Sequence, residues 1–276
     1  MKAIGVDIGG TKTAIGIIDY KTGKISKKLI FPSKSFKNDT KNLNLIIEKA
    51  LELSYVNKIN RIGIGVPELI NNKGIIKGNY NFDWNNINLT RYFPKEIKVL
   101  VDSDVRCHLR AEKFFGVAKN YKNFAYINIG TGLSYAQFKE NDIYSGANGY
   151  AIHFASSTIS LYDWKKNKKV SLIPEDYYSG KELVKILNIK NTNIKKRIMK
   201  NVAESLATLI GSLINTIDPA KIVLGGGVII NNANFTKILI SNIRKYILAD
   251  EVKKISIVTS KLKDNTGLLG AGLLFK

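Results

Sequence analysis

The sequence predicts an α/β fold of two lobes with a cleft between them. Its 276 residues exceed what one hydrophobic core usually organises, so two lobes are expected. A strand, a glycine-containing turn and a second strand follow one another twice, around residues 7–11 and 128–132, which indicates an internal repeat. No linker or low-complexity tract separates the two halves, so they are expected to be lobes of one unit rather than independent domains.

The first repeat begins at the N-terminus. Short apolar runs alternate with turn residues, and an apolar pattern at helical spacing runs from Leu43 to Leu53. A further strand is stopped by Pro67, and a helix follows with Ser103 or Asp102 as its cap. The predicted strands are 3–7, 13–20, 24–31, 61–66 and 98–101, and the second helix covers 102–115.

The second repeat starts near residue 124. Two strands flank the turn Gly130-Thr131-Gly132, and a helix with a strong apolar stripe follows at 202–217. The remaining predicted elements are a strand at 221–224, a helix at 234–248, a strand at 255–259 and a closing helix from Gly267. We expect a small lobe of residues 1–117 plus 263–276 and a large lobe of residues 118–262.

The formal charge of +21 raises the question of a nucleic-acid or membrane partner. The lysines are spread along the chain, however, and no arginine-rich arm or aromatic platform accompanies them. A solvated lysine surface is the favoured interpretation, with no nucleic acid as partner. The single cysteine, Cys107, excludes an internal disulfide and a cysteine-based metal site. With no apolar stretch of about 20 residues, we expect no membrane contact and a cytoplasmic protein.

Both glycine turns suit the binding of phosphate. Glycine leaves backbone N–H groups uncovered and permits positive φ, so the amides can point at phosphate oxygens. Each turn joins strand to strand, unlike a Walker loop or a dinucleotide fingerprint, which enter helices. The alternative is that both turns are ordinary glycine hairpins, but the occurrence of two such turns, one in each repeat, disfavours it. The predicted phosphate-binding residues are Gly9, Gly10, Thr11, Lys12, Thr13, Gly130, Thr131 and Gly132.

Two further features fit a nucleotide. Gly225, Gly226 and Gly227 end an apolar strand and offer a flat surface for adenine or ribose, although a plain loop is the alternative. Asp7 ends the first strand, where it can hold Mg²⁺ through water.

Asp104 is the candidate general base. It lies in the first turn of a predicted helix, where the helix dipole favours an ionised carboxylate. Such a group can accept the proton of a hydroxyl that attacks phosphorus. Taken alone, an Asp in this position is more commonly a helix cap.

Several motifs together resemble the ROK family (repressor, open reading frame, kinase), which has the actin/hexokinase/Hsp70 ATPase fold. The matching segments are Val6 to Lys12, Ile62 to Pro67, Val101 to Glu112, Asn128 to Gly132, Gly146 to Gly149, Glu175 to Gly180, Asp218 to Val228 and Gly267 to Ala271. The resemblance covers nearly the whole chain. It implies a two-lobe actin-like ATPase of ribonuclease H-like repeats, with ATP and Mg²⁺ bound in the cleft between the lobes.

The resemblance implies a sugar kinase with Asp104 as catalytic base. The sugar-binding set by this match is Gly65, Asn81, Ser103, Asp104, Gly132, His153 and Glu175. Ser103 stands where the family usually has Asn, and Arg106 also stands where Asn is common. The family's habit is a homodimer, and the oligomeric state stays open.

The chain departs from the family after Ala151. An ungapped match puts His153 where the family has a sugar-binding Glu, and Ser156 where it has a zinc-ligating His. A gapped match equates His153 with that histidine instead. Because the family's cysteine cluster is also missing, we expect no structural zinc.

The expected function is therefore ATP-dependent phosphorylation of a hexose or N-acetylhexosamine. A catalytically weak sugar or nucleotide sensor of the same fold is the alternative, suggested by the replaced glutamate. A DNA-binding regulator is disfavoured, because the phosphate turn begins at Asp7 and leaves no room for a preceding helix-turn-helix.

Overall fold

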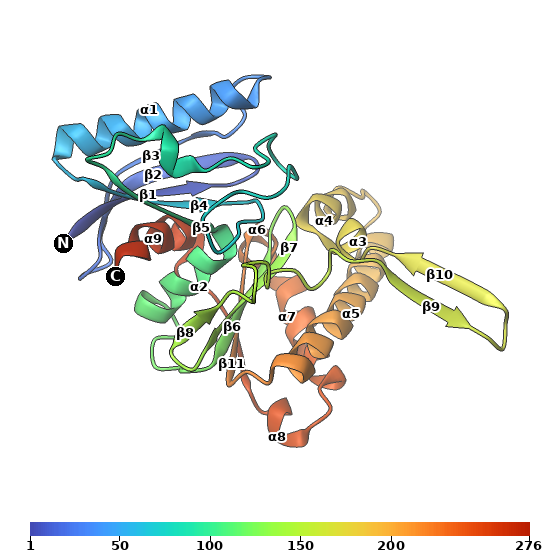
Figure 1. Cartoon of the computed structure of the whole chain (residues 1–276). Coiled ribbons are helices and arrows are strands. Elements are labelled where there is room, and N and C mark those ends of the chain that lie inside the picture. Colours follow the sequence, from blue (N-terminus) through green and yellow to red (C-terminus); the bar gives the residue numbers. More distant parts are fainter. The chain divides into compact units, whose positions relative to one another are not determined.

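The computed structural model describes residues 1–276, which group into two compact units. The first unit comprises Met1–Asn120, Ala136–Ala151 and Asp264–Lys276, and the second comprises Tyr121–Tyr135 and Ile152–Lys263. The chain is α/β with two five-stranded mixed sheets, so the predicted fold class is confirmed. Figure 1 shows the order of the elements along the chain.

The first unit is built on a sheet of order β3-β2-β1-β4-β5. The pairs β1/β2 and β2/β3 are antiparallel, whereas β1/β4 and β4/β5 are parallel. Its elements are β1 (Lys2–Ile8), β2 (Lys12–Asp19), β3 (Ile25–Pro32), α1 (Asp39–Asn57), β4 (Arg61–Val66), β5 (Lys98–Ser103), α2 (Asp104–Phe115), β8 (Asp142–Tyr144) and α9 (Thr266–Gly272), with the 3₁₀ turns η1 (Leu89–Tyr92) and η4 (Leu273–Phe275).

The alternation of side chains along β1 gives each face of this sheet its own helix. Ile4 and Val6 point into the core that α1 covers, because successive residues of a strand face opposite sides. Gly5 faces α9, and a Cβ there would lie 2.5 Å from the carbonyl oxygen of Leu268. Asp7 has the same parity as Gly5 and therefore lies on the α9 face of the sheet.

The second unit has a separate core. Its sheet has the order β12-β11-β6-β7-β8, of which β7 (Leu133–Lys139) passes from the second unit into the first. The elements are β6 (Phe124–Ile129), β9 (Ile159–Asp163), β10 (Lys168–Leu172), α3 (Glu175–Tyr178), α4 (Gly180–Leu187), α5 (Thr192–Ile217), β11 (Lys221–Gly225), α6 (Gly227–Asn231), α7 (Ala233–Ile243), α8 (Asp250–Lys253) and β12 (Ser256–Thr259), with the 3₁₀ turn η2 (Arg244–Tyr246). The 3₁₀ turn η3 (Lys263–Asn265) begins at the last residue of this unit and continues into the first. Leu206, Ile210 and Leu239 bring α5 and α7 together over the sheet in a fully buried cluster.

The units differ from the predicted lobes in one segment, Ala136–Ala151, which groups with the first unit. Side chains of that unit hold its backbone: Arg106 donates to the carbonyl of Gly149 (2.8 Å) and Asn72 donates to that of Ala147 (2.8 Å). The other large difference is the ribbon β9–β10, an isolated two-stranded sheet that projects from the second unit (Figure 1). Its strand residues are almost all exposed, so no periodic burial pattern announces it in the sequence.

Candidate active site

Strand register brings the candidate residues of the first unit to one edge of its sheet. Asp7 of β1 pairs with Gly65 of β4, and Gly65 pairs with Asp102 of β5. These three positions therefore form a row at the carboxyl ends of parallel strands, which is where open α/β sheets bind ligands. Asp104 follows two residues later, as the first residue of α2.

The N-terminus of α2 fixes Asp104. Ser103 caps the helix, since its hydroxyl accepts from the amide of Arg106 at 3.4 Å, which confirms one of the two predicted caps. Asp104 is thus not the cap. Gly65 allows α2 to approach β4: a Cβ there would lie 3.2 Å from Sγ of Cys107 and 3.6 Å from Cα of Asp104. Ser103 and Gly65 are buried, so both help to position Asp104.

The carboxyl of Asp104 has a strongly shifted pKa. The pKa is raised from 3.8 to about 7. Burial is the largest cause and the nearby carboxylates of Asp7 and Glu68 act in the same direction, whereas the amide of Val105 and the charge of Arg106 lower the pKa. Desolvation disfavours the charged form of an acid, and like charges act in the same direction. An acid whose pKa lies near neutral pH is matched to general-base chemistry.

Asp7 is the second shifted acid. Burial raises the pKa of its carboxyl to about 6, opposed by the charges of Lys12 and Lys28. Its oxygens lie against α9, where a Cβ on Gly267 would approach them to 2.3–2.5 Å. A desolvated carboxylate fits a cation, and Mg²⁺ typically takes only one or two carboxylates besides waters and substrate phosphates. The chain offers no cluster of three His, Cys, Asp or Glu side chains for a metal.

Glu68 organises the loop that carries Asn81, and the sequence did not reveal it. Its buried carboxylate accepts three consecutive amides, those of Tyr80 (2.9 Å), Asn81 (2.5 Å) and Phe82 (3.0 Å). The side-chain amide of Asn81 donates to the carbonyl of Pro67 at 2.7 Å, and this bond fixes the orientation of the Asn81 side chain. The sequence signal for Glu68 was its position as an acidic residue directly after Pro67, which ends the predicted strand. The family motif ends at Pro67 and so does not include Glu68.

The first glycine turn joins β1 to β2. The amide of Gly9 donates to the carbonyl of Lys12 (3.0 Å), while Gly10 and Thr11 make up the tip. The exposed amine of Lys12 lies 3.8 Å from Asp264. Thr13 is different: its side chain is fully buried and its hydroxyl lies 2.8 Å from that of Ser33. Its hydroxyl is therefore paired within the core in this structure, and the predicted contact of Thr13 with phosphate stays a prediction.

The second glycine turn joins β6 to β7. The amide of Gly130 donates to the carbonyl of Gly132 at 3.1 Å, and the amide of Gly180 donates to the carbonyl of Gly130 at 2.7 Å. Position 180 requires glycine, because a Cβ would lie 2.2 Å from that same carbonyl. Thr131 is exposed at the tip of the turn.

Glu175 holds the end of this second turn through hydrogen bonds. One carboxylate oxygen accepts the amide of Leu133 (2.6 Å), and the other accepts the hydroxyl of Ser156 (2.6 Å). The Ser156 oxygen is in turn 3.1 Å from Nδ1 of His153. Desolvation lowers the pKa of His153, and the charge of Glu175 partly offsets this. The structure thus joins His153, Ser156 and Glu175 in one hydrogen-bonded chain, although the sequence treated the first two as separate replacements.

The triple glycine has a packing explanation for two of its members. A Cβ on Gly225 would lie 1.8 Å from the Tyr126 hydroxyl, and one on Gly226, at φ +91°, would lie 2.5 Å from the Ile129 carbonyl. Gly227 is exposed and opens α6, with nothing closer to its Cβ position than an atom 4.0 Å away. The backbone therefore passes tightly over β6 and leaves a bare surface at Gly227.

Comparison with known proteins identifies the family of this chain. The model of the ROK family matches residues 3–160 and 154–276. The chain belongs to the ROK family. Among its curated relatives, this ROK protein is 25% identical to a glucokinase of Thermotoga maritima over the whole chain and 98% of the glucokinase. It is 23% identical to a β-glucoside kinase of Listeria monocytogenes over 98% of the chain and 96% of that kinase.

Solved structures show the same fold. The ROK family glucokinase of Streptomyces griseus, crystallised with glucose and AMPPNP, has a TM-score of 0.81 at 20% identity, covering 99% of this chain and 98% of that one. The ROK hexokinase of Thermus thermophilus has a TM-score of 0.76 at 21% identity, covering 99% and 97%. This ROK protein therefore has the two-lobe actin-like ATPase fold, as predicted.

The family also contains repressors. The xylose repressor of Bacillus subtilis is 24% identical over 76% of the chain, which matches 59% of the repressor. None of the helices of this ROK protein has both the length and the hydrophobicity that crossing a membrane requires.

Proposed function

We propose that this ROK-family sugar kinase transfers the γ-phosphoryl group of ATP to a hydroxyl of a hexose or N-acetylhexosamine, with Asp104 as the general base. The observation that supports this most is the raised pKa of Asp104, about 7, at the edge of the sheet where Asp7 and Gly65 also end their strands. Similarity to the glucokinase and the β-glucoside kinase supports the substrate class.

The proposed proton transfer is simple. The sugar hydroxyl loses its proton to Asp104 as its oxygen attacks the γ-phosphorus, and the bond between that phosphorus and the bridging oxygen of ADP breaks. Little covalent work remains for the protein, which must align oxygens and offset charge. A pKa near 7 lets Asp104 be ionised before the reaction and still hold the proton well during it.

The remaining residues are assigned to binding. The turn of Gly9, Gly10, Thr11 and Lys12 and the turn of Gly130, Thr131 and Gly132 would contact phosphates. Because the amides of Gly9 and Gly130 close these turns, the contacts would come from the other amides, the two threonine hydroxyls and Lys12. Gly227, with its neighbours Gly225 and Gly226, would contact the nucleoside. Asp7 would hold Mg²⁺, which when bound neutralises phosphate charge. Asn81, His153 and Glu175 would contact the sugar, while Gly65 and Ser103 position Asp104.

The proposal is tested by ADP release in a coupled assay with Mg-ATP across hexoses, hexosamines and N-acetylhexosamines. Sugar-dependent turnover that Asp104→Ala abolishes, with nucleotide binding kept, would support it. Turnover of the variant within a factor of about three of the native protein would show that Asp104 is not the base. Tight sugar binding without turnover would instead indicate a sensor.

A further inference from the structure

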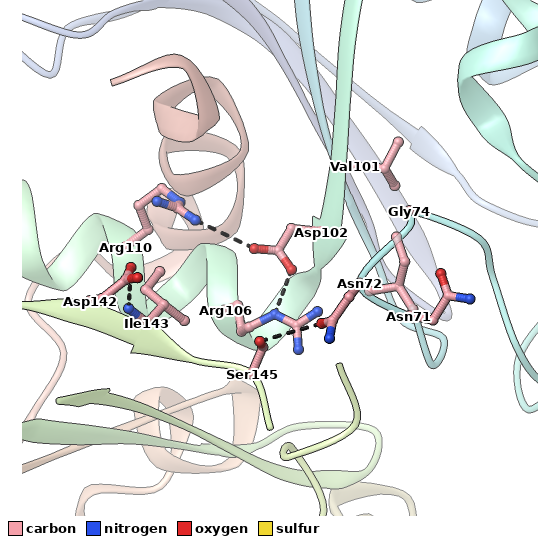
Figure 2. Close-up of a pocket in the computed structure, with 11 residues that line it drawn as sticks. Asn71, Asn72, Gly74, Val101, Asp102, Arg106, Arg110, Asp142, Ile143 and Ser145 are labelled. Carbon is pink, nitrogen blue, oxygen red and sulfur yellow. Dashed lines mark hydrogen bonds and ion pairs between the residues drawn. The ribbon is translucent and has the colours of Figure 1, made fainter. Parts of the chain in front are cut away.

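The first unit contains a pocket, lined mainly by polar side chains, that lies apart from the residues of the proposed reaction. Its volume is about 270 Å³, and neither Asp104, Asp7 nor Glu68 lines it. Figure 2 shows that four segments meet there: the loop after β4, the end of β5, one face of α2 and the start and end of β8. The lining residues are Ile70, Asn71, Asn72, Gly74, Val101, Asp102, Arg106, Arg110, Asp142, Ile143 and Ser145.

Two arginines of α2 meet in this pocket. Arg106 and Arg110 are one helical turn apart and so share a face of the helix. Both point to the carboxylate of Asp102, which lies between them in Figure 2. Nε of Arg106 is 2.5 Å from one carboxylate oxygen, and Nη1 of Arg106 donates to the Gly149 carbonyl at 2.8 Å. Arg106 is therefore well satisfied, and its side chain is only 5% exposed.

Arg110 is poorly satisfied by comparison. Its Nη2 is 3.4 Å from the second oxygen of Asp102, longer than the usual 2.7–3.2 Å of such a bond. Its Nε is buried and has no hydrogen-bond partner. Buried polar atoms are nearly always paired, so the guanidinium of Arg110 is less completely satisfied than that of Arg106, and its Nη2 group is free to exchange the long contact with Asp102 for a better acceptor.

We propose that this pocket, which we call the Arg110 pocket, binds a small phosphate-bearing molecule. A guanidinium presents a planar fork of N–H donors that matches phosphate oxygens better than any neutral group does. The hydroxyl of Ser145 and the Oδ1 of Asn72, joined only by a long contact of 3.4 Å, offer polar partners to hydroxyl groups beside the phosphate. The carboxylates of Asp102 and Asp142 both line the pocket and together balance the charges of the two arginines, so binding is expected to be weak rather than tight.

The size of the pocket narrows the ligand further. At about 270 Å³ it is below the usual range of pockets that hold drug-sized ligands, so it suits a sugar phosphate better than a whole nucleotide. A sugar phosphate is also the product of the proposed reaction. Identifying the ligand as that product rests on the proposed function, whereas recognition of phosphate rests only on Arg110 and its surroundings.

The pocket is connected to the catalytic helix. The Asp102 oxygen that contacts Arg106 also accepts the amide of Ser103 (2.8 Å), the residue that caps α2 directly before Asp104. A phosphate that takes Arg110 away from Asp102 changes the partners of this carboxylate. Product bound here would therefore lower kcat without competing with the sugar, as a feedback inhibitor.

Titration calorimetry with inorganic phosphate, and separately with glucose 6-phosphate, tests the proposal on the whole protein. Arg110→Met removes the guanidinium, and Asn72→Asp places a negative charge at the rim without altering α2. Each variant is expected to weaken binding at least tenfold. Arg91→Met is the matched control, because it removes an exposed arginine of the same unit outside the pocket and should leave binding unchanged.

The outcomes separate the sources of the signal. Binding that Arg110→Met and Asn72→Asp leave intact, or no binding by the native protein, would overturn the proposal. An equal loss in Arg91→Met would indicate only the diffuse attraction of a +21 chain and would overturn it as well. Loss of phosphate binding confined to the two pocket variants supports the site even in a protein without kinase activity, so its failure and that of the proposed function are distinguishable. Binding of glucose 6-phosphate but not of phosphate, lost in the same two variants, would support the sugar ester as the ligand.

Discussion

Asp104 of the first unit and Glu175 of the second are both acids beside a proposed substrate site, yet their surroundings are opposite. Asp104 is desolvated, lies near two other carboxylates, and accepts one backbone amide, that of Val105. Glu175 is paired at both oxygens, with the Leu133 amide and the Ser156 hydroxyl. The comparison teaches that environment assigns the role: the acid left without adequate partners is suited to take a proton, and the satisfied acid holds a turn in place.

The largest effect that tests this contrast is expected from Asp104→Asn. The variant keeps the shape of the side chain but cannot accept the proton, so kcat should fall by about 10²–10⁴. Nucleotide affinity should stay unchanged. Steady-state kinetics and nucleotide titration check both values.

A loss of activity in Asp104→Asn could also come from unfolding, so the stability of this variant is measured as a control. A pKa raised from 3.8 to about 7 means that ionised Asp104 destabilises the fold above pH 7, a cost absent below the unfolded pKa. Asp104→Asn should therefore raise the melting temperature at pH 8, and the gain should shrink as the pH falls from 7 towards 4. A variant less stable than the native protein at pH 8 would contradict this account of the buried charge.

Glu175→Ala should affect stability and binding more than the chemical step. It leaves the Leu133 amide without its acceptor, at a cost of about 1–3 kcal/mol in the free energy of unfolding. KM for ATP should also rise because the second turn loses its support, and KM for the sugar should rise because Glu175 is a proposed sugar contact. Glu175→Gln retains an acceptor and serves as the matched control in urea unfolding and kinetics. If Glu175→Ala lowered kcat as much as Asp104→Asn while leaving stability intact, the contrast between the two acids would fail.

Glu68→Gln should have a smaller effect on the pH dependence. Removing one negative charge near Asp104 lowers its pKa, so the acid side of the kcat/KM profile should move to lower pH by less than about one unit. The profile of Glu48→Gln, an exposed carboxylate on α1, provides the control and should not move. A shift to higher pH in Glu68→Gln would contradict the assigned interaction.

The smallest effect is expected from Ser156→Ala. It removes one of the two partners of Glu175 and separates His153 from the chain of hydrogen bonds, but the Leu133 amide stays paired. Stability should fall by about 0.5–1.5 kcal/mol, the usual net value of one hydrogen bond. Thermal unfolding measures it, and a loss larger than that of Glu175→Ala would reverse the proposed hierarchy.

The sequence predicted the parts of this molecule that depend on local pattern. The strands that carry Asp7 and Gly65, the cap at Ser103 and the glycine turns all follow from residues close together in the chain. The roles of Glu68 and Ser156 depend on hydrogen bonds across 12–14 and 19 positions, which no local pattern encodes. The burial of the Thr13 hydroxyl depends on a distant residue in the same way, because its partner, Ser33, lies directly after β3 and 20 positions along the chain.

The central claim is that the half-buried carboxylate of Asp104 is the base, and the pH dependence of kcat/KM tests it most directly. The account predicts activity that rises with pH through a midpoint near 7, because Asp104 must be ionised to accept the proton and its pKa is about 7. Activity that stays constant from pH 8 down to pH 5, as an unperturbed aspartate would allow, would contradict it.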